Sequence, residues 1–277
     1  MLSYITWTAD PAIFTIGSRE IRWYGLAFAI GFAIGYWIME KMWKKEQLNP
    51  MWLDKLFIYT VLGTVLGSRL GHCLFYAPDY YLANPVEILK IWEGGLASHG
   101  GTLGIIIAIY FYSKRITHKS MLWTFDRLVV PVGLVAAMIR LGNLMNHEIY
   151  GHATDMPWGI RFITNIPYWK HGAEPIFSAP SHPTQLYEAL CYIITFAVCM
   201  WLYWIKNAQK REGLIFGVFL EGIFLSRFFV EFVKNNQEAF EDSMMLNMGQ
   251  WLSVPFIIAG FWLIVRALKN KNNVQVD

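Results

Sequence analysis

The feature that most constrains this chain is a series of long apolar segments separated by short loops. About 20 apolar residues are enough for a helix to cross a bilayer. Seven segments qualify as candidates: 21–40, 54–77, 97–113, 122–141, 186–205, 213–232 and 250–268. Hydrophobic residues make up 55% of the chain and charged residues 16%, a balance that argues against a soluble domain. We therefore predict an all-α integral membrane protein with about seven transmembrane helices, in which 1–277 forms one polytopic domain.

The basic residues of the loops predict an orientation, because Lys and Arg accumulate on the cytoplasmic side of membrane proteins. Alternate loops each hold a cluster of three basic residues, and the loops between them are poorer in Lys and Arg. The clusters are Lys41, Lys44, Lys45; Lys114, Arg115, Lys119; Lys206, Lys210, Arg211; and Arg266, Lys269, Lys271. The isolated basic residues are Lys90, Arg161, Lys170 and Lys234. We predict an extracytoplasmic N-terminus and a cytoplasmic C-terminus in the bacterial cytoplasmic (inner) membrane.

The long loop 142–185 lies on the predicted outer side, between spans four and five. Repeated proline makes a long helix unfavourable there, and aromatic residues favour the level of the lipid headgroups. The prolines are Pro157, Pro167, Pro175, Pro180 and Pro183. We predict that this loop forms a small extracytoplasmic cap.

Charged residues inside predicted spans are costly, and their default interpretation is functional. The predicted orientation places three arginines near the outer ends of spans two, four and six. Tyr24 and His99 lie where spans one and three begin on that same side. The embedded charged residues are Arg69, Arg140, Arg227 and Glu231. Polar groups from five helices are thus expected at one depth, that of the outer-leaflet headgroups.

Arginine offers several rigid donors and a permanent charge, which suits a phosphate group. At headgroup depth this favours a phospholipid over a soluble anion. Gly63, Gly67 and Gly71 are spaced four apart and allow helices to approach closely. His99 is a candidate general base or headgroup contact, with glycines on both sides that permit a backbone turn near a ligand. These glycines are Gly94, Gly95, Gly100 and Gly101.

Other interpretations predict different patterns. Each arginine alone could snorkel or pair with Glu231 to hold helices together. A transporter or channel for an anionic solute would need polar residues continuing into the cytoplasmic half, where Glu221 is the main exception to an apolar composition. An intramembrane hydrolase would use Ser98 or a cysteine, but no G-x-S-x-G elbow is present.

His147, Glu148 and His152 form H-E-x-x-x-H, one residue too long for a zincin. We expect no metal, no cofactor and no nucleic-acid partner.

Six blocks in the chain carry a family resemblance. They are "RWYGL" (22–26), "GGLASHGG" (94–101), "RLGNLMNHEIYG" (140–151), "SHPTQLYE" (181–188), "SRFFVEF" (226–232) and "MGQWLSVP" (248–255). In this order they resemble the bacterial phosphatidylglycerol–prolipoprotein diacylglyceryl transferases over nearly the whole chain. The third block looks like the signature of that family.

The resemblance implies a membrane enzyme of lipoprotein biosynthesis that carries out protein lipidation. Such enzymes move the diacylglyceryl group of phosphatidylglycerol onto the lipobox cysteine of a preprolipoprotein signal peptide, forming a thioether and releasing glycerol phosphate. By similarity, Arg140 and Arg227 hold the phosphate, and His99 is the base or binds the headgroup glycerol. Also by similarity, lipid and substrate are positioned by Tyr24, Asn143, Glu148 and Gly151, with Glu231 orienting Arg227. Arg69 is assigned to phosphatidylglycerol binding from its charge and its depth in span two.

Two positions depart from the family pattern. Many members have tyrosine one turn before the second arginine, where this chain has Ile223. His147 replaces a residue that is commonly small, which adds a titratable group beside Glu148. Neither change removes the expected phosphate-binding arginines. Asn146 is left open, as either a further contact or a cap that closes the loop.

Overall fold

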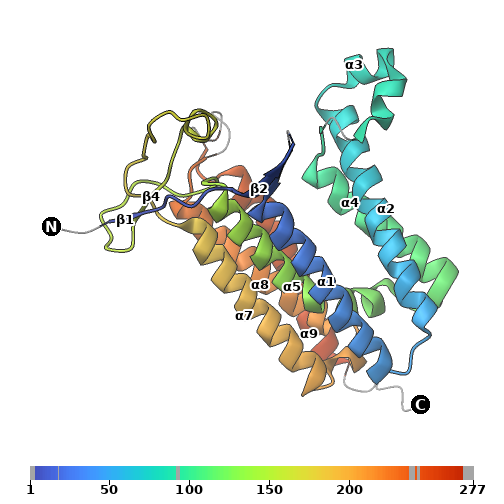
Figure 1. The fold of residues 1–277 in the computed structure, drawn as a ribbon. Helices are drawn as coiled ribbons and strands as arrows, with labels where there is room; N and C mark the ends of the chain where they lie inside the picture. The colour runs from blue at the N-terminus through green and yellow to red at the C-terminus, as the bar shows by residue number, and fades with distance from the viewer. Residues whose placement is uncertain (1–3, 18, 92–93, 237–240, 242–243, 271–277) are drawn as a thin grey trace. The chain divides into compact units, whose positions relative to one another are not determined.

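The computed structural model describes residues 4–17, 19–91, 94–236, 241 and 244–270, and seven of its helices cover the seven apolar segments (Figure 1). The helices are α1 Trp23–Lys45, α2 Pro50–Phe75, α4 Ser98–Tyr112, α5 Met121–Met145, α7 Thr184–Trp204, α8 Leu214–Val230 and α9 Met248–Lys269. Three of these, α5, α7 and α9, combine the length and the apolar composition needed to cross a membrane. The chain is thus mostly helical, as predicted.

The expectation of an all-α fold is wrong in one respect, because the described residues also form two small sheets. Strand β1 (Ile5–Thr6) pairs in parallel with β4 (Ile160–Arg161), and β2 (Ala12–Ile16) pairs antiparallel with β3 (Arg19–Arg22). The β2 sequence Ala-Ile-Phe-Thr-Ile is rich in the branched and aromatic side chains that favour strands. Strands β1, β2 and β3 lie before or at the start of the first apolar segment, and β4 lies in the loop 142–185, so none falls where helical periodicity gives a signal.

Short helical turns fill the connections. They are α3 Pro78–Ala83, η1 Pro85–Leu89, the π-helical turn η3 Ser113–Thr117, α6 Ile166–Trp169, η4 Ala208–Lys210 and η5 Glu231–Val233. The chain divides into two compact units, one containing Met1–Ile38 and Asp126–Asp277 and the other containing Met39–Phe125.

In the unit Met39–Phe125, helices α2 and α4 meet through glycines, as the spacing of Gly63, Gly67 and Gly71 predicts. A Cβ atom added to Gly63 would lie only 2.7 Å from the carbonyl oxygen of Gly104. One added to Gly71 would lie 2.7 Å from the Cα atom of Gly100. Real Cβ atoms do not approach this closely, so the two backbones touch only because no side chain intervenes.

In the other unit, helices α5, α7, α8 and α9 lie side by side (Figure 1). A Cβ at Gly133 of α5 would lie 3.1 Å from the backbone nitrogen of Phe196 in α7, and one at Gly217 of α8 would lie 2.9 Å from the carbonyl oxygen of Gly260 in α9. Asp126 of α5 accepts hydrogen bonds from the amides of Gly213 (2.6 Å) and Phe216 (2.8 Å) at the start of α8. These contacts fix the order of the four helices.

The segment between α5 and α7 folds around aromatic residues. Phe162 is fully buried, packs with Ile160 and Leu144, and stacks on Tyr150 with ring centroids 4.7 Å apart. The only helix described within it, α6, has four residues, which agrees with the effect expected from its prolines. Strand β1 joins this segment by pairing with β4, so the chain's beginning contributes to the predicted cap.

Candidate functional site

Arg140 lies near the end of α5, which continues to Met145 rather than ending at 141 as predicted. Because the helix continues, Arg140 and Asn143 share one face at i,i+3 spacing. The Nη1 atom of Arg140 donates to Asn143 Oδ1 at 3.3 Å. Its Nε atom lies 2.9 Å from Oε2 of Glu188 on α7, a carboxylate that is completely buried. Arg140 is therefore held from two sides.

Glu148 receives two amide side chains of the signature block. Asn143 Nδ2 donates to Glu148 Oε1 at 2.8 Å, and Asn146 Nδ2 donates to the same oxygen at 3.1 Å. Asn146 therefore helps to orient Glu148, and its role as a further contact or as a cap that closes the loop stays a prediction. The backbone carbonyl of Glu148 accepts a hydrogen bond of 2.7 Å from Gln185 Nε2 on α7. Asn143 thus links Arg140 to an exposed, fixed carboxylate.

Arg227 lies on the last turn of α8, with its Nε atom 3.6 Å from Glu231 Oε1, four residues later. Glu231 is buried, and its other oxygen accepts a 3.0 Å hydrogen bond from Asn247 Nδ2 at the start of α9. Gly249 makes room for it, since a Cβ there would lie 2.5 Å from Glu231 Oε1. Arg227 keeps 35% of its side chain exposed, so this arginine is partly open to a ligand.

Two charged residues of this cluster were not predicted from the sequence. Glu188 is buried beside Arg140, and the Nζ atom of Lys234 lies 3.6 Å from Glu188 Oε1 and 3.2 Å from Glu231 Oε1. The signal for Glu188 was a carboxylate within an apolar helix, which deserves a functional interpretation by the same rule as the arginines. Lys234 was counted only as an isolated loop lysine. We call Arg140, Glu188, Lys234, Glu231 and Arg227 the charge cluster.

Tyr24 and Gly151 lie in the same unit as the charge cluster. Tyr24, on the first turn of α1, packs against the α5 backbone, where a Cβ at Gly142 would lie 2.7 Å from Tyr24 Cδ2. Gly151 pairs with Lys234 in an antiparallel bridge, and its amide donates to the carbonyl of His182 at 2.8 Å. A side chain at Gly151 would collide with the carbonyl oxygen of Val233. Gly151 therefore allows the backbone at Val233 and Lys234 to lie close to its own backbone.

Arg69 and His99 belong to the unit Met39–Phe125. Arg69 is buried and donates to four backbone carbonyls. Its partners are Ile88 (2.9 Å), Gly94 (2.6 Å), Gly95 (3.3 Å) and Glu87 (2.5 Å). These bonds fasten the connection between α2 and α4 and leave little donor capacity for phosphate. Direct binding of phosphatidylglycerol by Arg69 stays a prediction.

His99 is exposed on the first turn of α4. The start of this helix is fixed on α2, because the amide of Ala97 donates to the carbonyl of Ser68 at 2.9 Å. Gly94 and Gly95 both have positive φ angles, +88° and +70°, which only glycine adopts readily. The predicted backbone turn before His99 is therefore present, and its role toward a ligand stays a prediction.

The ring of His147 is not exposed to solvent beside Glu148. It is buried and points into the cap. Its Nδ1 accepts a hydrogen bond from the amide of Ile163 at 3.1 Å, so Nε2 carries the proton and donates to the carbonyl of Ala9 at 2.8 Å. Burial lowers the pKa of His147, although the bond to Ala9 opposes the shift. His147 therefore joins the N-terminal segment to the cap as a neutral ring.

Ile223, the second departure, lies among apolar neighbours. It packs against the cluster of Ala137, Ala189 and Tyr192. The guanidinium carbon of Arg140 lies 6.0 Å from the centroid of the Tyr192 ring. The phenol of Tyr192 therefore lies beside Arg140. It comes from α7, whereas Ile223 of α8 carries no hydroxyl group.

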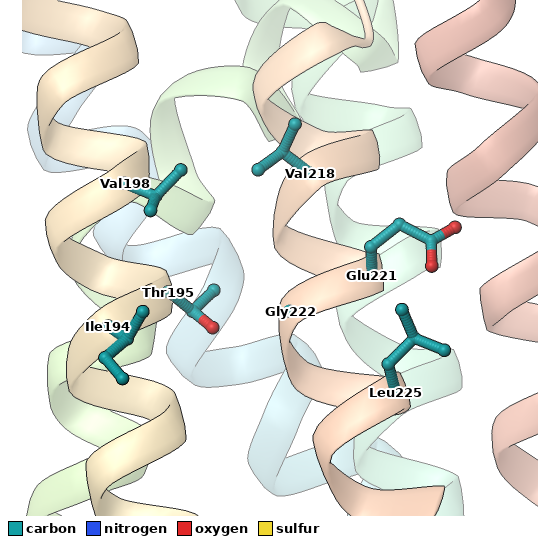
Figure 2. A pocket seen from close by; sticks show the side chains of 7 residues that line it. All are labelled: Ile194, Thr195, Val198, Val218, Glu221, Gly222 and Leu225. Carbon is teal, nitrogen blue, oxygen red and sulfur yellow. The ribbon is translucent and has the colours of Figure 1, made fainter.

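A groove of about 320 Å³ lies between α7 and α8, and no residue of the charge cluster lines it (Figure 2). Its only polar lining side chains among the described residues are Thr195 and Glu221. The Oγ1 atom of Thr195 donates to the carbonyl of Cys191 in its own helix at 2.9 Å. Figure 2 shows the Glu221 carboxyl turned away from Ile194 and Thr195. This lining offers no continuous polar path of the kind an anion transporter would need.

Comparison with known proteins gives a consistent result. The family model described as prolipoprotein diacylglyceryl transferase matches residues 11–266. A protein of Porphyromonas gingivalis named phosphatidylglycerol–prolipoprotein diacylglyceryl transferase is 57% identical, over 97% of this chain and 96% of its own. Proteins with the same name from Chloroherpeton thalassium and Bacteroides fragilis are 44% and 41% identical, over 96% and 98% of both chains.

Proposed function

This chain belongs to the prolipoprotein diacylglyceryl transferase family, and from that premise we propose how its charge cluster serves the reaction. The protein is a membrane transferase that moves a diacylglyceryl group from phosphatidylglycerol to a prolipoprotein. One observation carries the proposed site: two arginines on different helices are each held by a separate buried carboxylate. The contacts among the five residues of the charge cluster support the proposed reaction.

The acceptor in the proposed reaction is the thiol of a lipobox cysteine in the signal peptide. Its sulfur attacks the glycerol carbon that carries the phosphate, forming a carbon–sulfur bond. The carbon–oxygen bond breaks, and its electron pair stays on the departing glycerol phosphate. The thiol proton goes to a base, because the thiolate is the reactive nucleophile and a free cysteine has a pKa of about 8.5.

The charge cluster suits the charge that develops on the phosphate. It contains three cations and two carboxylates, so one positive charge is in excess. Phosphatidylglycerol brings one negative charge as a phosphodiester, and the leaving glycerol phosphate gains a second. Arg140 and Arg227 would bind the phosphate, and preorganised cations stabilise the second charge more in the transition state than in the ground state.

We call Arg140 and Arg227 the phosphate clamp, and the groups around them orient it. Glu188 and Asn143 fix Arg140 from two sides, and Glu231 fixes Arg227. Tyr24 packs against the turn that carries Arg140 and Asn143, which supports its proposed role in positioning the substrate. Glu148 is exposed and held by two asparagines, and in this proposal it contacts the incoming peptide or lipid headgroup.

His99 would act either as the base for the thiol or as a contact for the headgroup glycerol. The two roles predict different kinetics for His99→Gln. Loss of the base would lower kcat and remove an ionisation from the pH dependence of kcat. Loss of a headgroup contact would raise the KM for phosphatidylglycerol and leave the pH profile of kcat unchanged.

The proposed setting is the bacterial cytoplasmic membrane, with seven spans formed by α1, α2, α4, α5, α7, α8 and α9. The clusters of Lys and Arg support a cytoplasmic C-terminus, an extracytoplasmic N-terminus and an extracytoplasmic cap at 142–185. Arg140 and Arg227 both lie at the ends of their helices that lead to this side. The clamp would therefore meet phosphatidylglycerol in the outer leaflet.

The experiment uses the purified protein in detergent with phosphatidylglycerol and a peptide that carries a lipobox cysteine. Release of glycerol phosphate and the mass of the peptide are followed together. The proposal expects release that depends on the cysteine, together with a gain of one diacylglyceryl group. A Cys→Ala peptide is the control. Release without a change in peptide mass would indicate a hydrolase and contradict the proposal.

A further inference from the structure

Lys234 is a buried lysine at the centre of the charge cluster. It follows the 3₁₀ turn η5 and is only 3% exposed. Its Nζ atom lies 3.2 Å from Glu231 Oε1 and 3.6 Å from Glu188 Oε1. An ammonium group is costly to bury unless it is paired. Lys234 therefore depends on both carboxylates, which come from different parts of the chain.

The backbone of Lys234 is fixed independently of its side chain. Gly151 pairs with Lys234, and the amide of His152 donates to the carbonyl of Val233 at 2.9 Å. The side-chain amide of Asn235 donates to the carbonyl of Gly151 at 2.9 Å. This fixed backbone delivers the ammonium group to one point between the two carboxylates.

Each of those carboxylates also holds one arginine. The result is a continuous chain of charges from Arg140 through Glu188, Lys234 and Glu231 to Arg227. We infer that Lys234 is a positioning residue that couples the two arginines and maintains the single excess positive charge of the site. The inference rests on the proposed function, in which those arginines bind the phosphate.

Removing Lys234 would change the electrostatics in a specific way. Two arginines would then face two carboxylates, and the cluster would have no excess charge to meet the leaving phosphate. Glu188, with no exposed side-chain surface, would keep Arg140 as its one charged partner among the described residues. Breaking a buried ion pair by removing one partner is strongly destabilising because it leaves the other charge uncompensated. The remaining arginines would therefore bind their carboxylates instead of the phosphate.

The test is a double-mutant cycle between Lys234→Met and Glu188→Gln, measured in the peptide assay. Lys234→Met is expected to lower kcat by about 10- to 100-fold, since the lost charge acts mainly in the transition state. Lys234→Arg keeps the charge and should retain most of the activity. The double variant again has one excess positive charge, and it should transfer faster than Lys234→Met alone. Losses that simply multiply would overturn the inference.

Lys90 provides a matched control. It pairs with Glu87 at the same i,i+3 spacing, at 2.6 Å, but keeps 33% of its side chain exposed. Lys90→Met should leave kcat unchanged, because an ion pair that is partly open to solvent contributes little. An equal loss in Lys90→Met would show that any lysine matters and would contradict the special role of Lys234.

Thermal unfolding in detergent is measured for the same four proteins of the cycle. The inference expects the double variant to unfold at a higher temperature than Lys234→Met, and additive shifts would contradict it. If the wild-type protein transferred nothing to the peptide, the proposed function would fail. The unfolding cycle would still decide whether Lys234 and Glu188 are coupled.

Discussion

The two helix contacts that matter most in this protein are built in opposite ways. Helices α2 and α4 touch where side chains are absent, with Gly63 and Gly71 against Gly104 and Gly100. The ends of α5, α7 and α8 are instead joined by long charged side chains whose partners are buried. The stability of the first contact should depend on the size of the side chains at the glycine positions and not on charge. The second should be sensitive to charge and tolerant of neutral changes nearby.

The largest expected effect is the loss of a cation that touches the phosphate. Arg227→Ala should lower kcat on the order of 100- to 1,000-fold, as removal of one preorganised donor does in other enzymes. Arg227→Lys keeps the charge but loses the planar fork, so it should recover only part of the activity. Both are measured by glycerol phosphate release. Equal activity of the alanine and lysine variants would contradict a charge-based role.

The next effect concerns size. Gly63→Leu should prevent α2 and α4 from closing and lower the unfolding free energy by about 1–3 kcal/mol or more. Gly25→Leu is the matched control, because nothing lies within 4 Å of a Cβ at Gly25. Unfolding in detergent is followed by circular dichroism. If both variants unfolded alike, close glycine packing would not be what holds α2 on α4.

A smaller effect is expected for Arg69, which carries charge but bonds only to backbone carbonyls among the described residues. Arg69→Met should lower stability by about 1–3 kcal/mol, since it leaves partly buried carbonyls without donors. The KM for phosphatidylglycerol should change little. A large rise in KM with unchanged unfolding would instead support the direct lipid contact predicted from the sequence.

The smallest effect is a pH dependence in the cap. Because the pKa of His147 is lowered in the folded protein, the unfolded chain binds more protons below about pH 6.5. The contribution of His147 to stability is therefore present above that pH and is lost as the pH falls. His147→Asn should flatten the dependence of the unfolding temperature on pH between about 5 and 7. His171→Gln, at an exposed position of the cap, should leave it unchanged.

The sequence predicts the helices of both contacts well, because long apolar segments and glycine spacing are local signals. It does not predict the β2–β3 hairpin, which lies before the first such segment. Glu188 is not predicted as a site residue because it lies near the start of a span, where a helix boundary is expected. Lys234 is predicted to be a loop residue because its two partners lie on separate elements, which one sequence does not reveal. Pairing between distant positions such as Arg140 and Glu188 is not visible in one sequence.

The central claim is that Arg140 and Arg227 form a phosphate clamp, and Arg140→Ala tests it most directly. The variant is purified in detergent, its unfolding temperature is compared with that of the wild-type protein, and both receive phosphatidylglycerol and the lipobox peptide. We predict a folded protein that gives the peptide no diacylglyceryl mass gain and releases no glycerol phosphate. Normal transfer by a folded Arg140→Ala protein would contradict the clamp.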